Sequence, residues 1–112
     1  MNKVKRIIEV EKMNALNISN FRDKSINKIV TDPPWGINMG KELDLEYFYR
    51  NMLMEFLRIL KINGLIIMLI GKKDLFENVL LEFSNQLKLA EQYNILVSGK
   101  KAGIYKLKHQ KK

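Results

Sequence analysis

A β-branched run that ends in an acid and two prolines constrains this chain most strongly. Residues 29–36 read Ile-Val-Thr-Asp-Pro-Pro-Trp-Gly. Proline fixes its own φ and has no amide hydrogen for a sheet ladder, and Pro34 also holds Pro33 extended. The pattern predicts a strand that stops in a stiff loop, presenting the carboxylate of Asp32, a free carbonyl and the ring of Trp35. Open α/β sheets bind ligands outside such carboxyl ends of strands.

The first half of the chain reads as two strands followed by a helix. A short β-rich run spans residues 6–10, and a second strand spans 26–31 and leads into the loop. Turn and capping residues lie between them. A helix is expected from about Asp44, which can cap its free amides, to Lys61. Its apolar face, at three- and four-residue steps, consists of Leu45, Phe48, Met52, Phe56, Ile59 and Leu60.

The second half adds a strand, a helix and a hairpin. Asn63-Gly64 is a helix-stop and turn signal, and the apolar run 65–70 is typical of a strand buried on both faces. A second helix is expected from about 74 to 85. A hairpin turn at 98–103 should precede an antiparallel strand at 102–108 and a frayed basic tail at 109–112. Residues 87–97 predict a strand with one wet face, its apolar side being Leu87, Leu89, Tyr93, Ile95 and Val97.

This order of elements predicts an α/β fold. Alternating strands and helices favour a mostly parallel sheet, here with an antiparallel hairpin at its C-terminal end. The 112 residues are enough for one small domain, and the sequence shows no internal repeat, low-complexity segment or linker.

The chain is strongly basic, with a formal net charge of +8 and a pI near 9.7. That balance favours an anionic partner, most simply nucleic acid. The other interpretation is a basic surface that only keeps the protein in solution. The same choice applies to the lysines of the hairpin region, which could contact phosphates or simply be solvated: Lys100, Lys101, Lys106, Lys108, Lys111 and Lys112.

Several classes of site are disfavoured by composition. The sequence has no cysteine, which excludes disulfides and thiolate chemistry and fits a reducing cytoplasm. His109 is the single histidine, so no metal site is expected. No apolar stretch follows the basic N-terminus as in a signal peptide, and the run 65–70 is too short to span a bilayer. We therefore expect a cytoplasmic protein with no membrane partner.

The residues from Thr31 to Gly36 resemble the (Asp/Asn)-Pro-Pro-(aromatic) motif of class I S-adenosylmethionine-dependent methyltransferases that methylate amino nitrogens. The form Thr-Asp-Pro-Pro-aromatic-Gly-Ile is typical of RNA guanine-N2 methyltransferases, including those with a THUMP domain. Residues 60–64, Leu-Lys-Ile-Asn-Gly, resemble the family's Leu-Lys-Pro-Gly-Gly turn, and the terminal hairpin resembles its reversed last strand. The resemblance implies a partial Rossmann-like methyltransferase fold over residues 1–112, from the family's third strand to its last.

The resemblance also implies a role for each loop residue. Asp32 and the Pro33 carbonyl would accept hydrogen bonds from the target amino group, as the catalytic pair. Pro34, Trp35 and Gly36 would bind substrate, with Trp35 stacking on a base flipped out of its helix. Asp32 could instead simply cap the turn, and Trp35 could instead belong to the core.

The methyl donor's site is incomplete in this sequence. The family holds S-adenosylmethionine with a Gly-rich turn and an acid after the next strand, but no glycine precedes Gly36. Asn14-Ala15 stands where the family usually has an aspartate, and the amide oxygen of Asn14 can still accept a hydrogen bond. We therefore assign Asn14, Ala15 and Asp32 to cofactor binding. In the family, missing strands separate the strands 6–10 and 26–31, so these must shift together or a second chain must fill the gap.

The sequence thus predicts an S-adenosylmethionine-dependent N-methyltransferase domain that acts on RNA, at guanine N2 of tRNA or rRNA, and needs a missing half to bind its cofactor. Two alternatives stay open. One is a non-catalytic nucleic-acid-binding remnant or companion subunit, which the missing glycines favour. The other is a DNA amino-methyltransferase.

Overall fold

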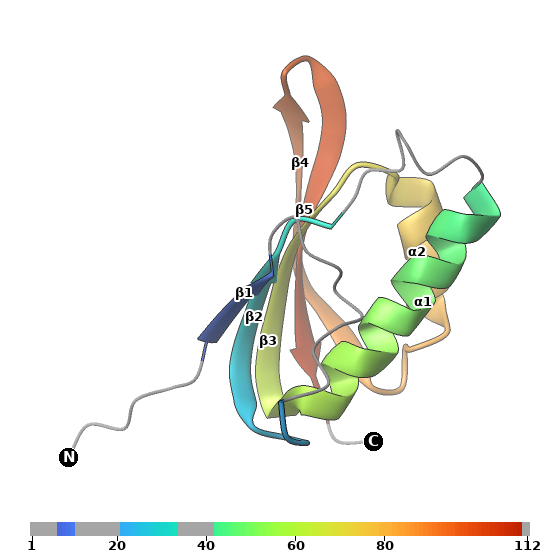
Figure 1. Cartoon of the computed structure of the whole chain (residues 1–112). Coiled ribbons are helices and arrows are strands. Elements are labelled where there is room, and N and C mark those ends of the chain that lie inside the picture. The colour runs from blue at the N-terminus through green and yellow to red at the C-terminus, as the bar shows by residue number, and fades with distance from the viewer. Residues whose placement is uncertain (1–6, 11–20, 34–41, 111–112) are drawn as a thin grey trace.

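In the described part of the computed structural model, two helices cover one face of a five-stranded sheet (Figure 1). The structure describes the backbone of residues 7–10, 21–33 and 42–110, and the side chains of 21–33 and 45–110. In chain order the elements are β1 (Ile7–Val10), β2 (Ile26–Thr31), α1 (Glu42–Ile59), β3 (Leu60–Ile70), α2 (Lys73–Leu81), β4 (Leu87–Val97) and β5 (Lys100–His109).

The sheet is mixed, with strand order β1-β2-β3-β5-β4. The pairs β1–β2 and β2–β3 are parallel, whereas β5 runs antiparallel to both β3 and β4. This confirms the α/β, partial Rossmann-like prediction and its antiparallel terminal hairpin. Ile8 lies opposite Ile29, so the two N-terminal strands that the family resemblance separates are direct neighbours here.

The core lies between the helices and one face of the sheet. Ile66, Met68 and Ile70 of β3 are at most 1% exposed on that face. Leu65, Ile67 and Leu69 point to the other face and are only partly buried. The prediction of a strand buried on both faces is therefore wrong for the described part of the molecule, because α1 and α2 both pack on one side (Figure 1).

A row of aromatic rings joins the helices to the sheet. Tyr49 of α1 packs edge-on against Phe76 of α2 with ring centroids 5.4 Å apart, and Phe76 packs edge-on against Tyr105 of β5 at 5.0 Å. All three side chains are fully buried. Tyr49 and Leu53 extend the predicted apolar face of α1, and of its predicted members only Phe48 is partly exposed.

Both helices end earlier than the sequence predicts. The apolar period carries the α1 prediction past Ile59, but Leu60 already pairs with Ile26 of β2. The Asn-Gly signal appears inside β3 as a register shift, with Asn63 at a φ of 70°. Helix α2 ends at Leu81, and a series of hydrogen-bonded turns connects it to Leu87.

The hairpin differs from the prediction in three respects. Its turn is only Ser98 and Gly99, and a register shift between Leu89 and Glu91 moves the later apolar residues of β4 to the other face. Both faces of β4 are consequently mostly exposed rather than one. His109 ends β5 instead of fraying: it is 6% exposed, and its Nδ1 lies 3.1 Å from the Leu60 carbonyl.

Candidate functional site

Asp32 and Pro33 lie at the edge of the sheet where parallel strands deliver their carboxyl ends. They follow β2 directly, and Thr31 lies opposite Met68 of the parallel strand β3. Asp32 is exposed, Pro33 is buried, and Thr31 is 5% exposed. The buried residues Thr31 and Pro33 therefore flank an exposed carboxylate directly after the strand.

An apolar hollow of about 260 Å³ lies beside Asp32, on the face of the sheet opposite the helices. Its lining residues come from β2, β3 and the hairpin: Val30, Thr31, Asp32, Ile67, Met68, Leu69, Ile95 and Ile104. Asp32 is the one ionisable residue among them. An apolar wall with a single carboxylate suits a flat ligand that carries a hydrogen-bond donor at its edge.

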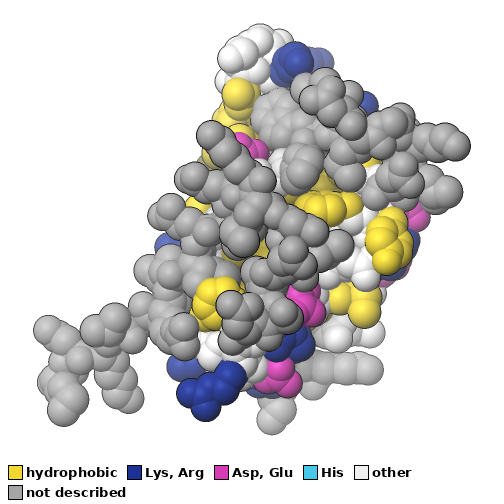
Figure 2. Space-filling view, viewed as in Figure 1, with side chains coloured by type: hydrophobic (Ala, Val, Ile, Leu, Met, Phe, Trp, Pro, Cys, Tyr) yellow, Lys and Arg dark blue, Asp and Glu magenta, His cyan; other side chains and the backbone are white. Residues whose placement is uncertain are grey.

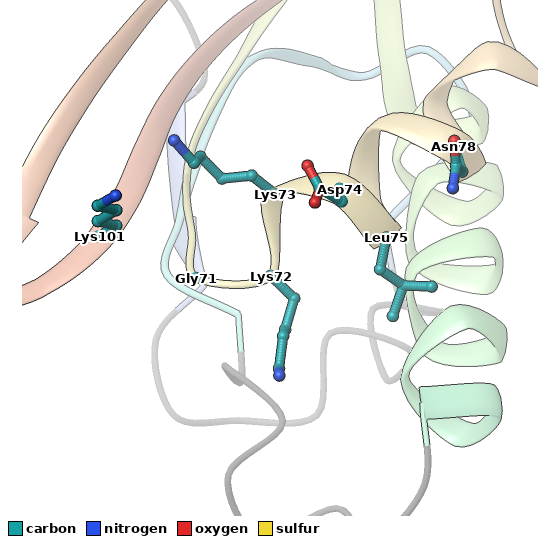
Figure 3. Close-up of a pocket in the computed structure, with 7 residues that line it drawn as sticks. All are labelled: Gly71, Lys72, Lys73, Asp74, Leu75, Asn78 and Lys101. Carbon is teal, nitrogen blue, oxygen red and sulfur yellow. The ribbon is translucent and has the colours of Figure 1, made fainter.

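A second, basic hollow of about 410 Å³ lies at the same edge, between the start of α2 and the hairpin (Figure 3). Gly71 directly follows β3 there, and Lys72, Lys73 and Lys101 contribute three positive charges to the lining. Figure 2 shows basic side chains at the top of the molecule, over the end of the hairpin. The remaining lining residues are Asp74, Leu75 and Asn78.

The structure describes two of the nominated loop residues, Asp32 and Pro33, and their roles remain predictions. The other nominated positions lie outside the described residues: Asn14, Ala15, Pro34, Trp35 and Gly36. Sequence reasoning missed Lys72 and Lys73, although two lysines directly after the glycine that ends a strand were a readable signal.

The buried tyrosines of the core have structural roles. Burial raises the pKa of Tyr105 well above its ordinary value, and its hydroxyl donates a hydrogen bond to Glu77, which raises that pKa further. This bond ties β5 to α2. Burial likewise raises the pKa of Tyr49. Both phenols therefore stay protonated at neutral pH.

Comparison with protein families then identifies the chain. The model of the RMKL-like methyltransferase domain matches residues 2–102, nearly the whole sequence. The chain belongs to the RMKL-like methyltransferase domain family. The family is one of S-adenosylmethionine-dependent methyltransferases. No curated protein sequence matches the chain.

Several solved structures share the fold of this RMKL-like chain. TrmN from Thermus thermophilus is 20% identical, with a TM-score of 0.69 over 87% of this chain and 27% of its own. A provisionally named DNA modification methylase from the same species, in complex with S-adenosyl-L-methionine, is 14% identical with a TM-score of 0.67 over 97% and 55%. The N-methyltransferase NodS from Bradyrhizobium japonicum, in complex with S-adenosyl-L-homocysteine, is 11% identical with a TM-score of 0.58 over 88% and 53%.

The RMKL-like chain therefore spans between about a quarter and just over half of each of these structures. The described residues contribute the strand end with Asp32 and the apolar wall beside it. The sequence before Gly36 has no glycine for a dinucleotide-type turn. No group of His, Cys, Asp or Glu within the described ranges could hold a metal ion, and no helix there could cross a membrane.

Proposed function

We propose that this chain is the substrate-binding part of an S-adenosylmethionine-dependent N-methyltransferase that acts on RNA in the cytoplasm. The proposed target is guanine N2 of tRNA or rRNA, as in THUMP-containing RNA methyltransferases. The observation that carries the proposal is the position of Asp32 and Pro33, directly after β2 and beside an apolar hollow, in a chain of a methyltransferase family.

The proposed work of the loop is to hold an amino group in place. The carboxylate of Asp32 and the carbonyl of Pro33 accept its two hydrogens, which keeps the nitrogen lone pair aimed at the methyl group that S-adenosylmethionine supplies when bound. The negative carboxylate also offsets the positive charge that develops on the nitrogen. Trp35 stacks on the base, and Pro34 and Gly36 shape the turn beneath the ring.

Cofactor binding is proposed to be shared between this chain and a segment it lacks. Asn14 and Ala15 would contact the adenine, and Asp32 would lie between donor and acceptor. Residues 1–112 would then be a partial domain without the Gly-rich motif. The sheet supports this, because Val30, Ile67, Leu69 and Ile104 form an apolar face that neither described helix covers. A second chain or a further segment would cover this face around the hollow and leave the hollow beside Asp32 open to substrate.

Two other functions remain as alternatives. The absence of glycine before Gly36 favours a non-catalytic RNA-binding remnant or companion subunit. A DNA amino-methyltransferase is favoured by the name of one similar structure, a DNA modification methylase, and by the motif, which suits any exocyclic amine.

The deciding experiment measures methyl transfer from radiolabelled S-adenosylmethionine to tRNA, rRNA and DNA, with mass spectrometry of the nucleosides formed. N2-methylguanosine in RNA that disappears in Asp32→Ala is the expected result. Asp23→Asn is the matched control, since Asp23 is exposed and pairs with Arg58. Transfer that survives Asp32→Ala removes the assigned role, and a methylated amine only in DNA establishes the third function. Salt-dependent RNA binding without any cofactor binding in calorimetry establishes the second.

A further inference from the structure

Four lysines lie in the region where the second helix begins and the hairpin turns. Lys72 precedes α2 and Lys73 is its first residue, while Lys100 and Lys101 begin β5. Ile70 of β3 lies opposite Gly103 of β5, and this register places the two lysine pairs at one edge of the sheet. It is the edge at which Asp32 follows the parallel strand β2.

The charges of these lysines are not used inside the described part of the protein. Arg50 binds Glu46 and Glu82, Arg58 binds Asp23 and Glu55, and Lys106 lies 3.3 Å from Glu91. By contrast, no carboxylate of the described residues, including the neighbouring Asp74, lies within ion-pair distance of the four lysines. Such a group of unpaired cations is available to an external anion.

The position of Lys73 is built into the fold. Its stem passes over Gly103, where a Cβ would lie only 3.0 Å from the lysine Cδ, and its Nζ donates a hydrogen bond to Asn94 Oδ1 at 3.1 Å. Lys73 and Lys101 line both the 410 Å³ hollow and a third hollow, of about 390 Å³, on the hairpin side. They thus form a basic ridge between two hollows.

The lysines do not converge on one point. In Figure 3, Lys73 extends toward the strand that carries Lys101, whereas Lys72 extends away from both. A compact anion would need its donors aimed at one centre. Lysines spread along an open edge instead suit an extended polyanion, which meets one ammonium with each of several phosphates.

We infer that Lys72, Lys73 and Lys101 bind consecutive phosphodiester groups of single-stranded RNA, on the strand that presents its target base to Asp32. The inference rests on the proposed function and adds to it the residues that hold the substrate backbone. Phosphate contacts of this kind position a strand without reading its sequence. Lys100, at the turn end of β5, extends the same path.

The test compares two triple variants of the whole chain by fluorescence anisotropy, with a labelled single-stranded RNA oligonucleotide at several salt concentrations. The site variant is Lys72→Gln, Lys73→Gln and Lys101→Gln. The control variant is Lys24→Gln, Lys61→Gln and Lys88→Gln, which removes the same charge from exposed positions at the opposite edge, beside the starts of β2, β3 and β4.

We expect the site variant to lose roughly tenfold or more in affinity and its log–log salt slope to fall by about 2, since each single-strand phosphate contact contributes roughly 0.7. The control should lose less than threefold. A triple lysine-to-arginine variant of the site should keep the affinity, which separates charge from a structural role. Circular dichroism of each variant confirms that it is folded.

Three results would overturn the inference. Equal losses in the two triple variants would show that only net charge matters, and tighter binding of a DNA oligonucleotide of the same sequence would assign the edge to DNA. If either occurs while methyl transfer to RNA persists, the proposed function stands and the inference alone fails. Absence of RNA binding at low salt together with absence of transfer removes both.

Discussion

The side chain of Lys73 lies directly over Gly103. The position of a Cβ on Gly103 would be 3.0 Å from the lysine Cδ and 2.8 Å from Cε1 of Tyr105. Because Gly103 has no side chain, Lys73 of helix α2 can extend its own side chain across β5 at this position. Any larger residue at this position must displace the lysine stem, the buried ring or both.

Gly103→Ala should accordingly lower the free energy of unfolding by roughly 1–3 kcal/mol, the usual cost of overpacking. Urea denaturation measures this loss. Adding Lys73→Ala should restore only part of it, because the flexible lysine can move whereas Tyr105 is fully buried. An unchanged denaturation midpoint in Gly103→Ala would show that the ring and the lysine shift at no cost.

Loss of the hydroxyl should affect the stability of the protein differently at the two buried tyrosines. Tyr49 Oη is buried with no hydrogen-bond partner among the described residues, whereas Tyr105 Oη donates to Glu77. Tyr49→Phe should leave stability unchanged or raise it by up to about 1 kcal/mol, and Tyr105→Phe should lower it by roughly 1 kcal/mol. Chemical denaturation of both variants decides this. A clear loss in Tyr49→Phe would reveal a partner for that hydroxyl.

His109 should make the fold sensitive to mild acid. Burial lowers the pKa of its imidazole, and the charge of Lys24 lowers it further against the hydrogen bond to the Leu60 carbonyl. The unfolded chain, with a histidine pKa of about 6.5, therefore takes up the proton first. The stability that the neutral imidazole contributes is fully present above the pKa of the unfolded chain. It declines as the pH falls toward the lower pKa of the folded protein.

Thermal unfolding between pH 7.5 and 5.5 should thus show a falling midpoint in the natural sequence. His109→Asn keeps a hydrogen-bond donor but cannot titrate, so its midpoint should change less over this range. Parallel curves for the two proteins would show that other groups cause the dependence.

Alanine substitutions at neighbouring residues of β3 should differ strongly in how much they lower the free energy of unfolding. Ile66 faces the helices and is fully buried, whereas Ile67 faces the uncovered side of the sheet and is partly exposed. Ile66→Ala should cost roughly 3–4 kcal/mol of unfolding free energy, and Ile67→Ala no more than about 1.5 kcal/mol. Equal costs in urea denaturation would mean that the second face is already covered.

Sequence reasoning predicts well what is encoded locally. The stop after Thr31 follows from the prolines that succeed it, and the hairpin follows from alternation around Ser98-Gly99. The position of Asp32 at a strand's carboxyl end follows from both its neighbours and the family resemblance. These features need no knowledge of distant contacts.

Features that depend on distant contacts were missed. The extra residue of β4 near Glu91 leaves no mark on the alternation, yet it exchanges the faces of the strand. The burial of His109 requires Leu60, and the gathering of Lys73 with Lys101 requires the register of β3 against β5. Likewise, an apolar run such as 65–70 reads as buried on both faces regardless of whether both are covered.

The strand order also governs when this protein can fold as it is synthesised. β5 lies between β3 and β4 in the sheet, although the ribosome makes it after both. The inner edge of β3 consequently waits unpaired until β4, the two-residue turn and β5 have all emerged. Hairpins close within roughly 1–10 μs once both strands are free, which is far faster than the addition of one residue. The sheet is therefore completed only after β5 has emerged, and a ribosome that pauses before β5 leaves an apolar strand edge open to aggregation.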